Sequence, residues 1–143
     1  SNYFYESNEG TFCLAMIETQ EAFDNLEEIA STTGLDGLYI GTADLTIGLN
    51  QGKLRPGFDR TEAEMIEAKK KILEIAHKNG KVACLHCGTP EYAAQATDWG
   101  FDLVTITNDV RLLSGAAAAH VKKFKELTNQ KIDISSEDDP SSY

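Results

Sequence analysis

The chain alternates between short apolar runs and longer segments in which apolar residues recur every three or four positions. The apolar runs cover residues 12–17, 37–43, 82–87 and 102–107. Uninterrupted runs of this length are typical of parallel strands covered on both faces, and the periodicity between them is typical of amphipathic helices. The pattern therefore predicts four consecutive strand–helix units, an α/β fold with neighbouring parallel strands.

Local signals predict where the helices begin and end. The expected N-terminal caps are Thr19, Thr89 before Pro90, and Asn108 or Asp109. Thr61–Glu64 has the form of a capping box for the helix that follows it, and Gly34 and Gly80 are typical helix stops. Segment 46–59 is rich in glycine and contains a proline, so it is predicted to be a long loop of the kind that often forms a lid.

Two acidic residues stand at the ends of successive predicted strands. Glu18 follows the first apolar run, and Asp44 follows the second through Gly41. In an α/β barrel the active site is built at the C-terminal ends of the strands, where two such carboxylates can share one metal ion. The structural alternatives are a helix N-terminal acid at Glu18 and a turn-forming aspartate at Asp44.

Composition and charge narrow the class of protein. The 143 residues carry a formal net charge of -10 and are 41% hydrophobic, which is typical of a soluble globular domain. The acidic balance argues against nucleic acid as a partner. No apolar run is long enough to cross a bilayer, and no signal-peptide pattern is present. The three cysteines lie in apolar runs and are expected to be reduced core residues of a cytoplasmic protein.

The length suggests half of a larger fold. Residues 1–10 are predicted to be a lead-in, 11–127 the folded domain, and 128–143 a polar acidic tail that is disordered. A closed (β/α)8 TIM barrel takes about 250 residues, whereas a flavodoxin-like sheet usually carries a phosphate-binding glycine loop that this chain lacks. The chain is therefore predicted to supply roughly the last four β/α units of a barrel.

A free half-barrel would expose two unpaired strand edges. The expectation is accordingly a missing N-terminal half, a partner chain, or self-association.

Several of these residues together resemble one family. The matching stretches are Met16-Ile17-Glu18-Thr19, Gly34 to Leu45, and Gly100 to Thr105 with Asn108-Asp109. Between Phe12 and Leu127 the chain resembles the HpcH/HpaI family of metal-dependent pyruvate aldolases, which is grouped with the citrate lyase β subunit. The pairing of an I-E-T strand end with a G-x-A-D-L strand end carries most of the resemblance.

The resemblance implies a metal-dependent carbon–carbon lyase. By resemblance, Glu18 and Asp44 hold a divalent metal (Mg²⁺, Mn²⁺ or Co²⁺), and the backbone amides of Gly41, Thr42 and Ala43 bind pyruvate or another 2-oxo acid. The implied reaction is the reversible aldol cleavage of a 4-hydroxy-2-oxo acid to pyruvate and an aldehyde by a class II pyruvate aldolase. Family members also form oligomers, so a homo-oligomer is expected.

The chain departs from the family pattern in three ways. Thr42 stands where the family often has proline, and Met16 stands where some members have glutamine. The family's catalytic histidine and substrate-binding arginine lie on early barrel strands, and nothing here corresponds to them. No catalytic residue is therefore assigned to this chain, the base is expected upstream, and the chain alone is expected to be inactive.

Two other functions stay open on the sequence. One is a non-catalytic half-barrel that serves as an assembly or metal-binding module. The other is a citrate-lyase-like enzyme that acts on acyl-CoA esters.

Two further motifs have structural explanations. One of them, Cys84-Leu85-His86-Cys87, is similar to half of a zinc site. Strand alternation separates its ligands and no second ligand pair exists, so packing in the core is favoured. His86 can face the barrel interior near the site. The small-residue run Gly115–Ala119 is expected to pack against the sheet or between subunits.

Overall fold

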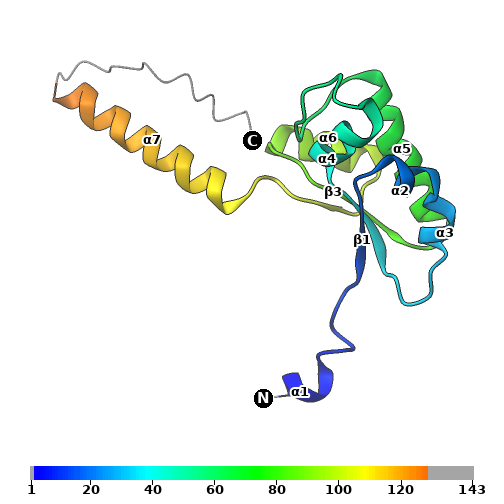
Figure 1. The fold of residues 1–143 in the computed structure, drawn as a ribbon. Helices are drawn as coiled ribbons and strands as arrows, with labels where there is room; N and C mark the ends of the chain where they lie inside the picture. The colour runs from blue at the N-terminus through cyan, green and yellow to red at the C-terminus, as the bar shows by residue number, and fades with distance from the viewer. Residues whose placement is uncertain (1, 129–143) are drawn as a thin grey trace. The chain divides into compact units, whose positions relative to one another are not determined.

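The computed structural model describes residues 2–128, and the chain divides into two compact units, residues 1–106 and 107–143. The first unit holds four strands, β1 (Leu14–Ile17), β2 (Gly37–Ile40), β3 (Val82–Leu85) and β4 (Leu103–Val104). Its helices are α1 (Tyr3–Glu6), α2 (Gln20–Asp24), α3 (Leu26–Ala30), α4 (Thr42–Asn50), α5 (Ala63–Lys78) and α6 (Pro90–Trp99). The second unit holds α7 (Asp109–Leu127), and all elements are drawn in Figure 1.

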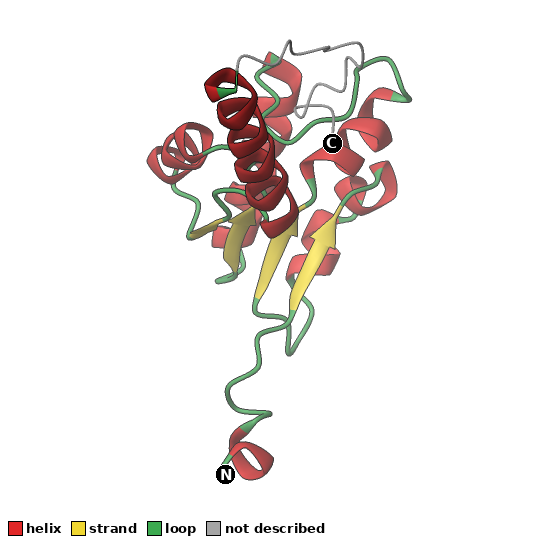
Figure 2. Ribbon diagram, turned by 90° about the vertical axis from the view of Figure 1, so that its left-hand side faces the viewer, coloured by secondary structure: helices red, strands yellow, loops and turns green. Residues whose placement is uncertain are grey.

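The four strands form one parallel sheet in the order β1-β2-β3-β4. Figure 2 shows their arrows pointing the same way, with helices in the connections between them. The register pairs Ile17 with Ile40 and Ile40 with Leu85, so the C-terminal ends of the first three strands are level. The predicted succession of neighbouring parallel strands is confirmed.

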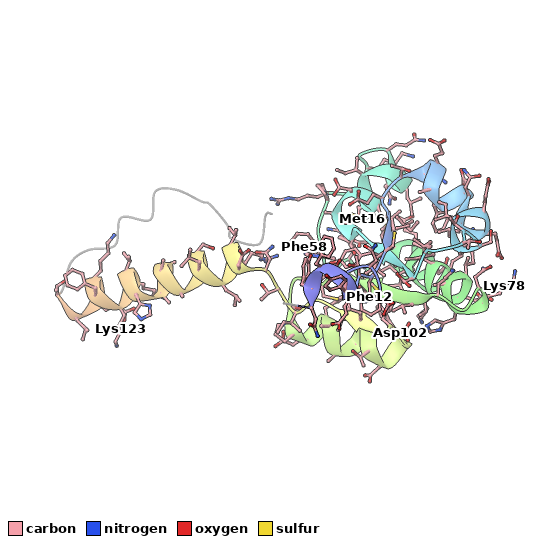
Figure 3. All side chains as sticks on the ribbon, turned by 90° about the horizontal axis from the view of Figure 1, so that it is seen from below. Phe12, Met16, Phe58, Lys78, Asp102 and Lys123 are labelled. Atoms are coloured by element: carbon pink, nitrogen blue, oxygen red, sulfur yellow. The ribbon has the colours of Figure 1, made fainter. Side chains whose placement is uncertain are left out.

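The core of the first unit lies between this sheet and its helices. Ile17, Ile40 and Leu85 are fully buried on one face, where they pack with apolar residues of α5 such as Ile72. Residues one position earlier or later point to the opposite face because strand side chains alternate. On that face Met16 of β1, labelled in Figure 3, keeps 54% of its surface exposed. That face is therefore open at β1, whereas Cys84 of β3 on the same face is fully buried.

The strands are shorter than the apolar runs predict. The first begins at Leu14, and the amide of the preceding residue, Cys13, donates to the Asp36 carboxylate at 2.6 Å instead of to a neighbouring strand. The second ends at Ile40, not at residue 43, because Gly41 is already the N-cap of α4. The third and fourth end at Leu85 and Val104.

The loop predicted over 46–59 is wrong in its first part. Helix α4 occupies Thr42–Asn50, and the connection without helix or strand follows it. Glycine at position 48 weakened the helical signal, yet Leu45 and Thr46 of the same helix are fully buried. Tertiary packing has overridden the local preference.

Three predicted caps are confirmed and one is wrong. The side chains of Thr19, Thr89 and Asn108 each accept a hydrogen bond from the amide three residues later. The capping box at Thr61 does not form: Glu62 is the N-cap of α5, and its side chain makes no capping bond because it pairs with Arg60.

The predictions for the cysteines and for the C-terminal tail have different outcomes. Cys84 and Cys87 are buried free thiols as expected, but Cys13 is exposed and is not a core residue. Residues 129–143, nearly all of the predicted acidic tail, lie outside the described residues. Across residues 2–128, no helix combines the length and hydrophobicity needed to cross a bilayer.

Candidate functional site

Glu18 is the first residue after β1, at the C-terminal edge of the sheet. Its neighbour Thr19 caps α2 by accepting the amide proton of Ala22 at 3.1 Å. Thr19 therefore serves the helix terminus, and Glu18 is not the residue that caps it. The side chain of Glu18 is half-buried and belongs to the strand end.

Asp44 follows the C-terminal end of β2, at the same edge of the sheet. The backbone turns from strand to helix at Gly41, and Asp44 lies exposed in the first turn of α4. The amides that open a helix have no partner within the helix, and Gly41 brings no side chain to cap them. The first turn of α4 thus directs backbone N–H groups, the positive end of the helix dipole, toward the edge that carries Glu18.

Gly41 is required by the carboxylate of Glu18. A β-carbon added at Gly41 would overlap Oε1 of Glu18 and would lie 2.8 Å from its Cγ. The φ angle of Gly41 is −83°, which any residue can adopt, so the need for glycine comes from this close approach. The side chain of Glu18 lies across the end of β2 only because residue 41 has none.

The negative charge of Asp44 acts on the carboxyl group of Glu18. Burial raises the pKa of Glu18 above its ordinary value, and the negative charge of Asp44 raises it further. Like charges held together without a compensating cation disfavour ionisation. A cation beside Glu18 would oppose this rise, because an opposite charge favours the ionised form of a carboxyl group.

The side chains at this edge of the sheet determine which metal ion it could hold. Within residues 2–128, no three His, Cys, Asp or Glu side chains converge to hold an ion. Glu18 and Asp44 supply two carboxylates, and Mg²⁺ is commonly held by one or two carboxylates with waters and substrate oxygens in the remaining positions. The residues present fit a hard divalent ion of that kind. The Cys84–Cys87 segment forms no zinc site, and both of its cysteines are buried thiols.

A second polar group lies on the same face of the sheet. His86 follows β3, and its amide donates to the carbonyl of Ile40 at 3.2 Å, which extends the ladder by one residue. His86 is therefore in register with Gly41 and Glu18, opposite the buried Leu85 face. The hydroxyl of Tyr39 lies 2.7 Å from Nδ1 of His86.

The sequence indicates that His86 can face the site but does not reveal its hydrogen-bond partner, Tyr39. Tyr39 lies two residues before Gly41, and strand alternation alone puts them on one face. Burial raises the pKa of the Tyr39 hydroxyl, and a hydrogen bond from Thr105 partly opposes that rise.

Comparison with known proteins decides the family. A sequence profile described as HpcH/HpaI aldolase/citrate lyase matches residues 4–115. The chain belongs to this family. It is 40% identical over 127 residues to a hydroxypyruvate/pyruvate aldolase of Rhizorhabdus wittichii, covering 89% of this chain and 49% of that protein. It is 32% identical over 130 residues to the 2-keto-3-deoxy-L-rhamnonate aldolase of Escherichia coli, covering 90% of this chain and 46% of that protein.

Solved structures of the HpcH/HpaI family agree with the fold. A family protein from Burkholderia cenocepacia superposes with a TM-score of 0.71 at 25% identity, covering 87% of this chain and 46% of that one. The citrate synthase SbnG shares the fold, with a TM-score of 0.72 at 22% identity. The predicted barrel-type α/β fold is confirmed, and this HpcH/HpaI chain spans about half the length of the relatives it matches. Its assignment to the last four units stays a prediction.

Proposed function

We propose that this chain supplies the metal- and pyruvate-binding part of a divalent-metal-dependent aldolase. The reaction is the reversible cleavage of a 4-hydroxy-2-oxo acid to pyruvate and an aldehyde. One observation supports the proposal: Glu18 and Asp44 follow successive strand ends at the same edge of the sheet, and the charge of Asp44 acts on Glu18 beside the open first turn of α4. The aldolase names of the relatives support the reaction type.

Each group has a distinct role in the proposal. Glu18 and Asp44 hold the ion, and Gly41 gives Glu18 the room to reach it. The amides of Gly41, Thr42 and Ala43 bind the carboxylate of the 2-oxo acid, because a helix N-terminus attracts anions. Thr42 is buried, and its carbonyl accepts the Thr46 hydroxyl at 2.7 Å, which fixes the turn. A divalent ion held there would supply the positive charge that polarises the 2-oxo group.

The proton-transfer groups are not assigned to these residues. In the proposal the catalytic base comes from the remainder of the barrel, together with the residues that receive the aldehyde. Residues 1–143 alone are therefore expected to bind metal more weakly than the whole protein and to show no turnover.

The first test uses full-length protein with isosteric carboxamide variants. Glu18→Gln and Asp44→Asn should each lower pyruvate release from a 4-hydroxy-2-oxo acid by at least about 100-fold, since each removes one of two protein ligands. Mn²⁺ binding, followed by electron paramagnetic resonance, should weaken in parallel. Glu21→Gln changes an exposed acid of α2 and should leave both readouts unchanged.

The outcomes separate the candidate functions. If the whole protein releases no pyruvate with Mg²⁺, Mn²⁺ or Co²⁺, the aldolase proposal is wrong. Metal binding that survives in that case favours the non-catalytic module. Competition by an acyl-CoA ester for the site favours the citrate-lyase branch instead.

A further inference from the structure

We propose that Asp59 is a positioning residue, whose carboxylate holds the ring of Phe58 as the wall of the substrate site beside β3. The inference rests on the proposed aldolase function and deepens it. It starts from segment 51–62, which joins α4 to α5 and contains no helix or strand. Connections of about 12 residues or more without secondary structure of their own are uncommon in compact domains and are often functional.

The ring of Phe58, labelled in Figure 3, lies on the face of the sheet that bears Glu18. Its centroid is 4.7 Å from the centroid of the His86 imidazole, at an interplanar angle of 54°. His86 directly follows β3, and its carbonyl accepts the Thr42 hydroxyl at 3.4 Å. This contact joins the end of β3 to the first turn of α4, where the 2-oxo acid is proposed to bind. Phe58 therefore lies on the β3 side of that turn.

Two residues later the segment is fixed on the opposite face of the sheet. The Arg60 carbonyl accepts hydrogen bonds from Nζ of Lys69 at 3.2 Å and from the hydroxyl of Tyr92 at 2.6 Å. Both of these side chains are buried, and Tyr92 belongs to the same hydrophobic core as Leu85. The segment thus crosses the C-terminal end of β3, from the site face at Phe58 to the core at Arg60.

Asp59 joins the segment to the strand end that it crosses. Its Oδ1 accepts the amide proton of Gly88 at 2.7 Å, and its Oδ2 accepts the Thr89 hydroxyl at 2.7 Å. Both donors lie just beyond β3 along the chain. Hydrogen bonds accepted by a carboxylate are stronger than those between neutral groups. Because both oxygens are engaged, the backbone at Asp59 is fixed, and the direction in which the neighbouring Phe58 leaves it is fixed as well.

The surroundings of Asp59 favour positioning over stabilisation. The bond between Asp59 and Thr89 lies at the surface, whereas the side chains that hold the Arg60 carbonyl are buried. Substitutions at the surface usually change stability little, so loss of the carboxylate should leave the fold intact. It should change the path of the backbone next to Phe58. Misplacing a group that orients the substrate by about 1 Å can lower the rate about 100-fold.

The test uses full-length protein with Mn²⁺ and measures pyruvate release from a 4-hydroxy-2-oxo acid. Asp59→Ala and Phe58→Ala should each lower kcat/KM about 10- to 100-fold, since one removes the anchor and the other the wall. Mn²⁺ affinity, measured by electron paramagnetic resonance, should stay within about twofold in both, because Glu18 and Asp44 are untouched. Asp98→Ala removes an exposed acid of α6 and should leave both readouts unchanged.

Two further measurements separate positioning from a general loss of structure. Hydrogen exchange of the Gly88 amide, followed by mass spectrometry, should become at least about tenfold faster in Asp59→Ala and stay unchanged in Phe58→Ala. The unfolding temperature of both variants should stay within a few degrees of the unsubstituted protein. Asp59→Asn keeps an oxygen for the Gly88 amide and should recover part of the lost kcat/KM. It carries the test if Asp59→Ala does not fold.

Each other outcome overturns the proposal. Activity lost in Asp59→Ala but kept in Phe58→Ala means that the carboxylate acts by another route. Unchanged kcat/KM in both variants means that the ring is no part of the site, and a parallel fall in Mn²⁺ affinity means that the metal site itself was disturbed. Absence of turnover in the unsubstituted protein overturns the aldolase function, and the positioning role falls with it.

Discussion

At the scale of single residues, Gly41 sets where the carboxylate of Glu18 can lie. The carboxylate of Glu18 occupies the space that any side chain at residue 41 would need. In full-length protein Gly41→Ala should therefore displace Glu18 and weaken Mn²⁺ binding about 10- to 100-fold, an effect of the size seen when groups that orient ligands are removed. Titration monitored by electron paramagnetic resonance measures it.

A matched glycine provides the control for that substitution. Gly10 has a normal backbone conformation, and a β-carbon there would meet only the Glu6 carbonyl at an ordinary 3.7 Å. Gly10→Ala should leave metal affinity unchanged. Equal affinity in the Gly41→Ala protein would show that Glu18 reaches the ion without that space.

A second residue-scale feature is the buried lysine of α5. Lys69 is fully buried, and its Nζ donates to the Tyr92 hydroxyl at 2.7 Å and to the Arg60 carbonyl at 3.2 Å. Burial lowers the pKa of Lys69 to about 8. An unfolded lysine titrates near 10.4, so the folded chain binds fewer protons between the two values and its stability should rise with pH across that window.

Lys69→Met should remove that rise. Between pH 7 and pH 10.5 the unfolding free energy of the unsubstituted chain should gain about 3 kcal/mol relative to the variant, the equivalent of a shift from 10.4 to about 8. Urea unfolding at a series of pH values gives the difference. The Cys87 thiol, whose pKa burial raises to about 11, is present in both proteins, so only the change in its coupling to residue 69 enters the difference. Parallel curves would mean that Lys69 stays charged up to its ordinary pKa.

At the scale of elements, the caps show how far the sequence could predict local structure. Thr89 caps α6 as predicted even though its hydroxyl also donates to the Asp59 carboxylate at 2.7 Å, because donating that proton leaves the oxygen able to accept from the amide of Tyr92. The capping box at Thr61 fails because Arg60, which lies outside the four-residue motif, pairs with Glu62. The helix begins one residue later than a capping box requires, with Glu62 as the N-cap. Motif reasoning succeeds where contacts from outside the motif leave the capping oxygen able to accept.

The different roles of Thr89, which caps α6, and Thr61, which does not cap α5, give a stability prediction. Thr89→Ala should lower the unfolding free energy by about 1 kcal/mol, the usual cost of losing a side-chain cap. Thr61→Ala should change it by less than about 0.5 kcal/mol, since Thr61 caps nothing in α5. Thermal unfolding of the two variants compares them directly, and equal losses would contradict the assigned helix start.

The candidate site could be predicted only in part, because some of its contacts join residues that are far apart in the sequence. Glu18 and Asp44 are visible in the sequence because each ends an apolar run. The pairing of Tyr39 with His86 depends on register between strands 47 residues apart, which no local window contains. That α4 starts directly after Gly41 also escaped prediction, because burial of Leu45 outweighs the weak helical pattern.

At the scale of the whole molecule, the first unit has one sheet face that is open at β1 and β4, and two edge strands. Met16 of β1 and Leu103 of β4 lie on that face with 54% and 46% of their surfaces exposed. Strand edges and apolar surface of this kind favour association. Residues 1–143 produced alone should therefore form oligomers at micromolar concentration in sedimentation velocity experiments.

Charged substitutions on that face test the explanation. Met16→Lys with Leu103→Lys should shift the population toward monomer without lowering the unfolding temperature by more than a few degrees, because neither side chain is in the core. A monodisperse monomer in the unsubstituted chain would contradict the predicted self-association.

The strand order also sets the sequence in which the chain can acquire its structure. The register pairs Leu14 with Gly37, Gly37 with Val82 and Cys84 with Leu103, so every strand joins the one made just before it. The middle pairing closes the longest stretch of chain and therefore carries the largest entropic cost of closure. During synthesis β1 and β2, with the two carboxylates at their ends, can pair before β3 leaves the ribosome. Of these four strands, the pair that carries both proposed metal ligands at its ends is thus the first able to form.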